Sequence, residues 1–225
     1  MPRAGGRGAR GVLISGVPGV EPAKVVVLGG GVVGLNAGRI AAGVGAQVTI
    51  FDINARRLRY LYDVLPPNVT LLYSNPFMIR KKVRQADVVI GATLVAGAKA
   101  PVLVTREDLQ HMKDGSVIVD VAVDQGGCTE MCRPTTHSDP TFVEEGVLHY
   151  CVANMPGSVA RTSTFALTNV TLDYLSVLAE AGVAGLVGLG DEAAQGVNIH
   201  KGRIYHSGVA SAFGMPRAAL SEMVV

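Results

Sequence analysis

The sequence is poor in cysteine, tryptophan and aromatic residues in general. Its 225 residues include three cysteines (Cys128, Cys132 and Cys151), no tryptophan and 5% aromatic side chains. An odd number of cysteines leaves one unpaired in any disulfide scheme, which is typical of a reducing compartment. We therefore expect a cytoplasmic protein. The remaining composition, 48% hydrophobic with 28 glycines, favours an α/β protein whose core is built from Val, Ala and Leu.

The sequence also has no large excess of positive or negative side chains. The formal net charge is +2, which gives no reason to expect binding to nucleic acid or to a membrane surface. No uninterrupted apolar run approaches the roughly 18 residues that a membrane helix needs. The basic opening MPRAGGRGARG lacks the apolar segment of a signal peptide. We therefore expect no membrane association and no secretion.

The sequence also lacks a usual metal-binding pattern. Cys128 and Cys132 could be combined with His137 and His149, but this spacing matches no common zinc motif. The sequence therefore predicts no metal site.

A glycine-rich turn between two apolar segments is the most informative feature that is present. Lys24 to Leu28 is apolar and too short for a helix, which is typical of a buried strand. Gly29, Gly31 and Gly34 follow with the G-x-G-x-x-G spacing. In a strand-turn-helix unit, such glycines permit a tight turn, close approach of the backbone to a pyrophosphate, and packing of helix on strand. The spacing predicts a dinucleotide site.

An acidic residue completes this pattern. A helix is predicted from Val33 to Val44 and a second strand from Gln47 to Phe51, and Asp52 follows directly. A carboxylate at this position accepts hydrogen bonds from a ribose diol and repels a 2′-phosphate, so the sequence favours NAD over NADP. Arg56 and Arg57 could tolerate NADP, but surface charge is the preferred interpretation.

Strands and helices alternate along most of the chain. Strands are predicted at Lys24 to Leu28, Gln47 to Phe51, Val69 to Tyr73, Asp87 to Ile90, Ser116 to Val121 and Leu148 to Val152. Helices are predicted at Val33 to Val44, 54 to 65, 76 to 85, Thr105 to Met112 and Thr164 to Ala181. This alternation predicts a Rossmann-type, doubly wound parallel sheet with right-handed crossovers. Past residue 160 the alternation stops.

Ligands of such sheets bind beyond the carboxyl ends of the strands. That rule selects Asp52, Ser74, Thr93, Leu94, Asp124 and Asn154. Asp124 could be a general base, an orienting acid or only a turn residue before two glycines. Asn154 could bind a carboxamide or a ribose, or could cap the following turn. His137 could titrate near neutrality, but a solvated loop histidine is the simpler interpretation.

Five strings together resemble the alanine dehydrogenase family. They are GVPGVEPAKVVVLGGGVVG, GATLVAGAKAP, VDVAVDQGGC, RPTTHSDP and YCVANMPGSVARTSTFALTN, in the family's order and at compatible spacing. The related transhydrogenase subunit shares the glycine motif and the AKAP-type loop, but resembles this sequence less where the fifth strand ends. The Asp124-Gln125 pair is the discriminating detail.

The resemblance implies reversible oxidative deamination of L-alanine to pyruvate and ammonia, with NAD as cofactor. The cofactor contacts that it implies are Val32, Val33, Asp52, Arg57, Ser74, Thr93, Leu94, Val121, Asp124, Val152, Asn154 and Met155. Asp124 would also be the catalytic carboxylate. The glycines Gly29, Gly31 and Gly34 join this set through their spacing.

The resemblance also predicts how the chain is divided. We expect a lead-in at residues 1–11, a Rossmann domain at 12–160, and at 161–225 the C-terminal, helical part of an incomplete substrate domain. In the family an N-terminal segment builds most of that domain, and no counterpart of it is found here. We therefore expect a homo-oligomer, or a partner of a separate N-terminal segment. A non-catalytic NAD-binding module and a transhydrogenase-like domain remain the alternatives.

Overall fold

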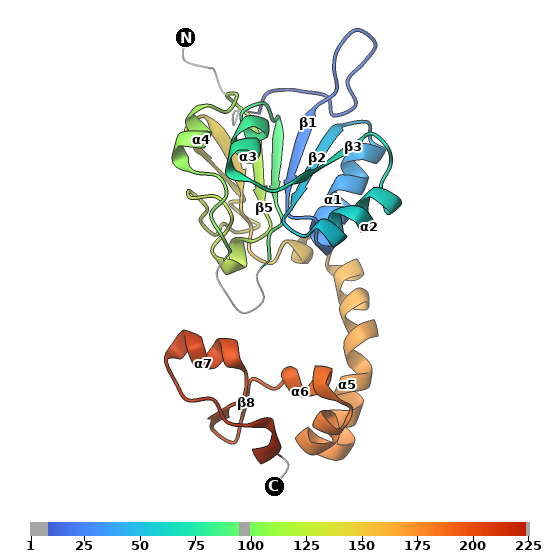
Figure 1. Ribbon diagram of the computed structural model, residues 1–225, viewed down its shortest axis with the longest axis vertical. Coiled ribbons are helices and arrows are strands. Elements are labelled where there is room, and N and C mark those ends of the chain that lie inside the picture. Colours follow the sequence, from blue (N-terminus) through green and yellow to red (C-terminus); the bar gives the residue numbers. More distant parts are fainter. Residues whose placement is uncertain (1–8, 95–99, 224–225) are drawn as a thin grey trace. The chain divides into compact units, whose positions relative to one another are not determined.

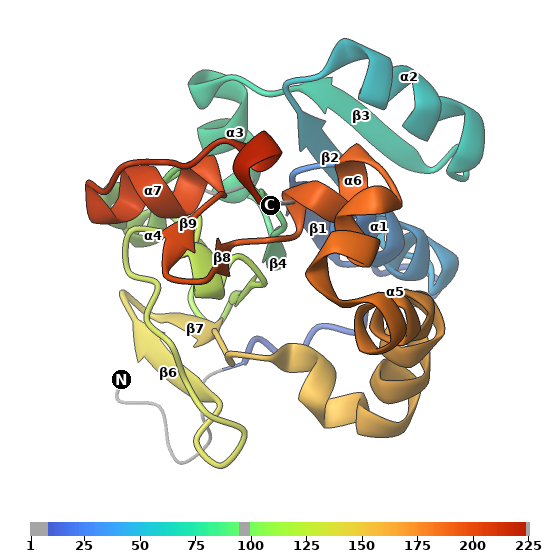
Figure 2. The ribbon, with the colours of Figure 1, turned by 90° about the horizontal axis from the view of Figure 1, so that it is seen from below.

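The computed structural model describes residues 9–94 and 100–223, so most of the lead-in and the AKAP-type loop lie outside the described residues. The chain divides into two compact units, the first ending at Met155 and the second beginning at Pro156. Figures 1 and 2 show the elements of each unit in two views.

The first unit is built on a seven-stranded sheet with the order β3-β2-β1-β4-β5-β7-β6. The strands are β1 (Lys24–Leu28), β2 (Gln47–Asp52), β3 (Val69–Tyr73), β4 (Val88–Gly91), β5 (Val117–Asp120), β6 (Thr141–Glu144) and β7 (Val147–Tyr150). All neighbours from β3 to β7 are parallel, so the predicted α/β Rossmann-type sheet is confirmed. The chain order reverses between β1 and β4, which makes their carboxyl ends the switch point where such folds bind ligands.

Helices cover both faces of this sheet. They are α1 (Val32–Gly43), α2 (Ala55–Val64), α3 (Pro76–Val83) and α4 (Arg106–Gln110), with the short 3-10 turn η1 (Val123–Gln125) after β5. Because alternate side chains of a strand point to opposite faces, β1 serves two cores. Val25 and Val27 pack with Leu35 of α1 and Leu61 of α2. Val26 and Leu28 belong to the core that α3 and α4 complete.

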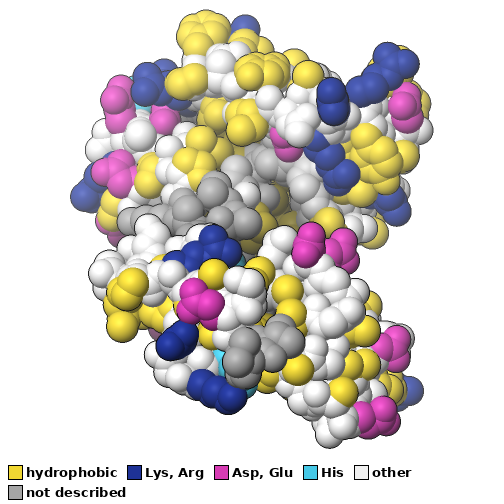
Figure 3. Space-filling view, turned by 60° about the horizontal axis from the view of Figure 1, so that its bottom comes forward, with side chains coloured by type: hydrophobic (Ala, Val, Ile, Leu, Met, Phe, Trp, Pro, Cys, Tyr) yellow, Lys and Arg dark blue, Asp and Glu magenta, His cyan; other side chains and the backbone are white. Residues whose placement is uncertain are grey.

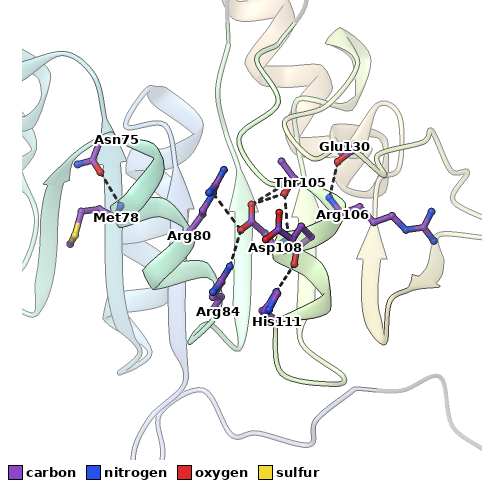
Figure 4. Close-up of polar contacts among 10 residues, drawn as sticks. Asn75, Met78, Arg80, Arg84, Thr105, Arg106, Asp108, His111 and Glu130 are labelled. Carbon is purple, nitrogen blue, oxygen red and sulfur yellow. Dashed lines mark hydrogen bonds and ion pairs between the residues drawn. The ribbon is translucent and has the colours of Figure 1, made fainter.

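A buried carboxylate joins α3 to α4. Asp108 forms a capping box with Thr105 and accepts hydrogen bonds from its backbone N–H (3.2 Å) and hydroxyl (2.9 Å). The guanidinium groups of Arg80 on α3 and of Arg84, its C-cap residue, lie 3.8 and 3.9 Å from the other oxygen (Figure 4). With only 3% of the Asp108 side chain exposed, these contacts replace the water that the charge has lost.

One edge of the sheet differs from the purely parallel prediction. β6 pairs antiparallel with β7 and forms a hairpin that the sequence did not indicate. Its turn places Glu145 at φ 48° and Gly146 at φ 77°, as a two-residue type I′ turn requires. The Asn-Gly pair that usually indicates such a turn is absent here. The polar segment before the turn was therefore interpreted as a loop and not as the first strand of a hairpin. The other predicted strands and helices are present, with ends shifted by a few residues.

The second unit is smaller and mostly helical. After η2 (Met155–Val159) it consists of α5 (Ala160–Gly188), α6 (Asp191–Gln195), β8 (Ile199–His200), β9 (Arg203–Ile204), α7 (Ser207–Phe213) and η3 (Leu220–Glu222). Its buried cluster contains Val197, Tyr205 and Met223. Gly182 has a non-helical conformation (φ 64°, ψ −166°), so α5 is kinked near its end. Val183, Leu186 and Val187 beyond the kink pack against the cluster.

No side chain of α5 is buried, although the helix is largely apolar. Leu167, Val170 and Leu172 are 62, 65 and 61% exposed, and hydrophobic side chains lie at the surface of this unit in the lower part of Figure 3. Met155–Gly188 is long and apolar enough to cross a membrane, with a mean hydropathy of 1.5 over its most apolar window. The search for apolar runs in the sequence missed this helix, because scattered Thr, Ser and Gly interrupt the run but barely lower its hydropathy. Length and composition are the only grounds for naming it a candidate, and one such helix does not overturn the expectation of no membrane association.

Candidate functional site

Two chain turns meet at the switch point, and Gly29 allows them to do so. Gly29 has φ +103°, which L side chains rarely adopt, and its N–H donates to the Phe51 carbonyl (2.9 Å). A Cβ atom on this residue would lie 2.6 Å from the carbonyl oxygen of Ala92, which follows β4. Only glycine therefore lets the turn after β1 contact the turn after β4.

Gly34 and Gly31 have complementary roles at the start of α1. A Cβ on Gly34 would overlap the carbonyl oxygen of Gly29, so the helix packs directly on the turn. Gly31, the N-cap residue, makes no side-chain cap, and a Cβ there would meet open space. Val32 and Val33 follow, 76 and 43% exposed. The first N–H groups of α1 thus face an accessible space, which suits a phosphate group.

Asp52, at the end of β2, holds the glycine turn in place. Its Oδ2 accepts a hydrogen bond from the Gly30 N–H (2.8 Å), and its Oδ1 accepts one from the Asn54 N–H (2.7 Å). A carboxylate has about four acceptor positions, so capacity for a ribose hydroxyl remains.

Arg57, in the first turn of α2, contacts the same glycine turn. Its guanidinium donates to the carbonyl oxygens of Gly30 (2.5 Å) and Gly31 (3.2 Å) and stacks 4.8 Å from the Tyr60 ring centroid. The Asn54 side chain caps α2 by accepting from the N–H groups of Arg56 and Arg57. Arg57 is thus occupied by the loop itself and is more than a surface charge.

The ends of β3, β4 and β5 bring further predicted residues to this edge. The Ser74 N–H donates to the Asp52 carbonyl, and the Val121 N–H donates to the Gly91 carbonyl, both at 2.9 Å. The Thr93 hydroxyl is buried and lies against the Cys128 thiol. Leu94 is 75% exposed.

Asp124 lies in η1 and is exposed, on a loop that a second, buried carboxylate fixes. That carboxylate is Asp120, whose Oδ1 accepts from the Ala122 N–H (3.1 Å). Its Oδ2 accepts from the N–H groups of Cys128 (2.9 Å) and Thr129 (3.1 Å) and from the Thr129 hydroxyl (3.1 Å). The sequence analysis did not single out Asp120. The available signal was a charged residue inside an apolar strand, because such a residue needs several buried donors.

The end of β7 carries the last predicted residues. Val152 is buried and bridges to Thr135, whereas Asn154 has φ 53°, a left-handed conformation. Nε2 of His137 lies 3.2 Å from the Asn154 carbonyl oxygen. The His137 side chain is exposed, as predicted for a loop histidine, and it contacts the loop that carries Asn154. Met155 begins η2.

The predicted cofactor residues thus gather at the carboxyl edge of one sheet, in the first unit. Among the described residues, no group of three His, Cys, Asp or Glu side chains has the geometry of a metal site. A glycine cradle, a helix N-terminus without a side-chain cap and an acidic residue at the end of β2 fit a dinucleotide.

Comparison with known proteins gives a family for this arrangement. The family model "Alanine dehydrogenase/PNT, C-terminal domain" matches residues 4–207. The alanine dehydrogenase of Halomonas elongata is 50% identical over 97% of this chain and 59% of that protein. The alanine dehydrogenase of Methanococcus maripaludis is 52% identical over 93% of this chain and 56% of that protein.

Solved structures agree. An L-alanine dehydrogenase superposes with a TM-score of 0.84 at 52% identity, over 92% of this chain and 57% of that one. A transhydrogenase from Sinorhizobium meliloti superposes with a TM-score of 0.68 at 25% identity, over 87% of this chain and 53% of that one.

Proposed function

This chain belongs to the alanine dehydrogenase/PNT family, and we propose that it provides the NAD-binding part of an alanine dehydrogenase. The reaction would be the reversible oxidative deamination of L-alanine to pyruvate and ammonia. The chain spans 59% and 56% of two curated relatives, so the complete activity is part of the proposal. The transhydrogenase-like alternative has less support, because the identity to that structure is 25% against 52% to an L-alanine dehydrogenase.

The observation that carries the proposal is the glycine turn held between Asp52 and Arg57. The N-terminus of α1 would bind the pyrophosphate through its free N–H groups, with Val32 and Val33 beside it. Asp52 would accept hydrogen bonds from the ribose diol while keeping its bond to Gly30. A 2′-phosphate would be repelled by this carboxylate, which supports NAD rather than NADP.

The nicotinamide half would lie toward β4, β5 and β7. The residues proposed to contact it or its ribose are Thr93, Leu94, Val121, Asp124, Val152, Asn154 and Met155, with Ser74 nearer the adenosine half. When bound, NAD supplies a hydride acceptor for C2 of the amino acid. Asp124, exposed on the loop that Asp120 fixes, would exchange a proton with the water or ammonia that reacts at C2.

The proposed partners follow from the second unit. A helix that is apolar all round is normally covered, and α5 carries exposed Leu167, Val170 and Leu172. We assign residues 161–225 to the substrate domain, and we expect α5 to be covered by a second copy of the chain or by a separate N-terminal segment. We also propose that the protein is located in the cytoplasm.

A binding titration with NADH tests the proposal. Asp52→Ala should weaken NADH binding by about 1 to 3 kcal/mol, the usual effect of losing a charged hydrogen bond. Asp63→Ala removes an exposed carboxylate from the far part of α2 and should leave the affinity unchanged. Equal affinities in all three proteins would exclude Asp52 from the site.

Turnover is the second measurement. NADH oxidation with pyruvate and ammonia is expected to be lost in Asp124→Asn, whereas NADH binding should be weakened far less. NADH binding without turnover in the unsubstituted chain would favour a non-catalytic NAD-binding module or a requirement for a separate segment.

A further inference from the structure

Two cysteine thiols that the proposed reaction does not use lie beside the site. Cys151 directly follows β7 and is completely buried, whereas Cys132 lies on the loop after Asp124 and is partly exposed. Their thiols are hydrogen-bonded to each other. We refer to Cys132 and Cys151 as the thiol pair.

The backbone on both sides holds the pair together. The Thr135 N–H donates to the Cys151 carbonyl oxygen (2.9 Å), and the Cys132 N–H donates to the Thr129 carbonyl oxygen (3.0 Å). A Cβ atom on Gly127 would overlap the Cys132 side chain, so the loop packs tightly behind this sulfur. The rigid strand end and the short loop therefore keep the two sulfurs adjacent.

A buried imidazole shares the same face of β7. His149 precedes Cys151 by two residues, so both side chains point to one side of the sheet. His149 is 0% exposed, stacks on Phe142 with a centroid distance of 4.9 Å, and is hydrogen-bonded to the Cys151 thiol. This contact places an imidazole nitrogen where a proton can pass between it and the thiol.

The three thiols differ in pKa because their surroundings differ. The hydrogen bond from Cys132, aided by neighbouring His149, lowers the pKa of Cys151. The same hydrogen bond and burial raise the pKa of Cys132, so the pair shares one proton once ionised. Burial, aided by the charge of Asp120, raises the pKa of Cys128, which stays a protonated thiol. Thiolates, not thiols, react with peroxides and disulfides, so the pair is the reactive site.

We propose that Cys132 and Cys151 form a reversible intramolecular disulfide on reaction with a hydroperoxide. The ionised pair attacks the peroxide through the partly exposed Cys132 sulfur, its proton passing to Cys151. An S–O bond forms, the O–O bond breaks, and the alkoxide or hydroxide that leaves takes from solvent the proton that the pair released on ionising, which gives an alcohol or water. His149 then takes the Cys151 proton, and the Cys151 thiolate displaces hydroxide from Cys132. Hydroxide leaves as water with the proton from His149, so two thiols and one peroxide give one disulfide, one alcohol and one water.

The cross-link would join two loops of the proposed cofactor site. Cys132 lies on the loop that begins with Asp124, and Cys151 directly precedes Val152 and Asn154. A disulfide would fix the distance between these loops, which then cannot adjust around the nicotinamide half. This consequence rests on the proposed function: the oxidised protein should bind NADH severalfold more weakly than the reduced protein, and Cys151→Ser should show no such difference.

Peptide mapping of the unsubstituted chain tests the disulfide without reference to NADH. The protein is treated with hydrogen peroxide, unfolded in the presence of an alkylating reagent and digested. The expected result is a linked peptide containing Cys132 and Cys151, lighter by two hydrogen atoms, with Cys128 alone alkylated. Dithiothreitol should restore alkylation of all three cysteines. Cys132→Ser and Cys151→Ser should give no linked peptide, whereas Cys128→Ala should still give it.

The proposal is overturned by a linkage through Cys128, by disulfide-linked dimers, or by three freely alkylated cysteines after peroxide treatment. Equal NADH affinity of the reduced and linked forms would overturn the effect on the site. If neither form binds NADH but the linked peptide appears, the proposed function fails and the disulfide assignment stands.

Discussion

The two units of this chain use apolar residues in opposite ways. In the first unit, both faces of the sheet are covered, and side chains such as Leu61 and Val89 are completely buried. In the second unit, a small cluster around Tyr205 is buried, while α5 before its kink leaves side chains such as Leu167 and Val170 in solvent. Burial of apolar area is the main stabilising term in folding, so the first unit has its own core, whereas this part of α5 contributes little buried area.

Polar groups show the same contrast. Asp120 in the first unit is inaccessible to water and satisfied by backbone and side-chain donors. In the second unit the ion pair of Arg203 with Glu222 has side chains 62 and 52% exposed, so water competes with it. We therefore expect substitutions in the first unit to lower the free energy of unfolding far more than substitutions in the second unit.

The largest expected effect is that of Asp120→Ala. Several buried N–H groups would lose their acceptor, each at a cost of about 1 to 3 kcal/mol, so we expect the free energy of unfolding to fall by about 3 to 5 kcal/mol. Asp173→Ala, on the exposed surface of α5, is the matched change in the second unit and should have almost no effect. Urea unfolding measures both. Similar losses for the two variants would remove the contrast between the units.

A pair of leucine substitutions sharpens the comparison further. Leu61→Ala, at a completely buried position of α2, should lower the free energy of unfolding by about 2 to 5 kcal/mol. Leu172→Ala, at a position 61% exposed, should cost little in a dilute, monomeric chain. Thermal unfolding at several protein concentrations tests this. A large, concentration-dependent loss for Leu172→Ala would show that α5 is buried in an assembly.

The smallest expected effect is on the pH dependence of stability, through the carboxylate of Asp87. Burial acts to raise the pKa of Asp87, but the hydrogen bonds from the Lys24 N–H and Lys113 and the charges of Lys113 and Arg10 outweigh it and leave the pKa lowered. A carboxylate with a lowered folded-state pKa stabilises the protein above its unfolded-state pKa, and this stabilisation is lost as pH falls through the folded-state value.

Stability measured from neutral pH to below about pH 4 tests this effect. We expect the acid-induced loss to be smaller in Asp87→Asn than in the unsubstituted chain. Glu222→Gln, which alters the exposed ion pair of the second unit, should leave the pH profile unchanged. Identical profiles for all three proteins would contradict the role of Asp87.

Local patterns made much of the first unit predictable. The apolar run Lys24–Leu28 and the spacing of Gly29, Gly31 and Gly34 depend on neighbours in sequence, and the strand, turn and helix are where this pattern predicted them. The hairpin of β6 and β7 was missed because its turn uses Glu145 and Gly146 rather than a familiar turn pair. Asp120 was overlooked because its donors come from residues farther along the chain, around Cys128 and Thr129.

The sequence by itself determined the alternation of strands and helices, the dinucleotide motif and the family resemblance, because each is written in residues a few positions apart. Only the tertiary structure decided that Asp52 and Arg57 brace the glycine turn, that Asp120 fixes the loop of Asp124, and that Cys132 meets Cys151. These contacts join residues from different strand ends. They form only when the parallel sheet aligns those ends along one edge, where backbone donors and side chains can satisfy one another.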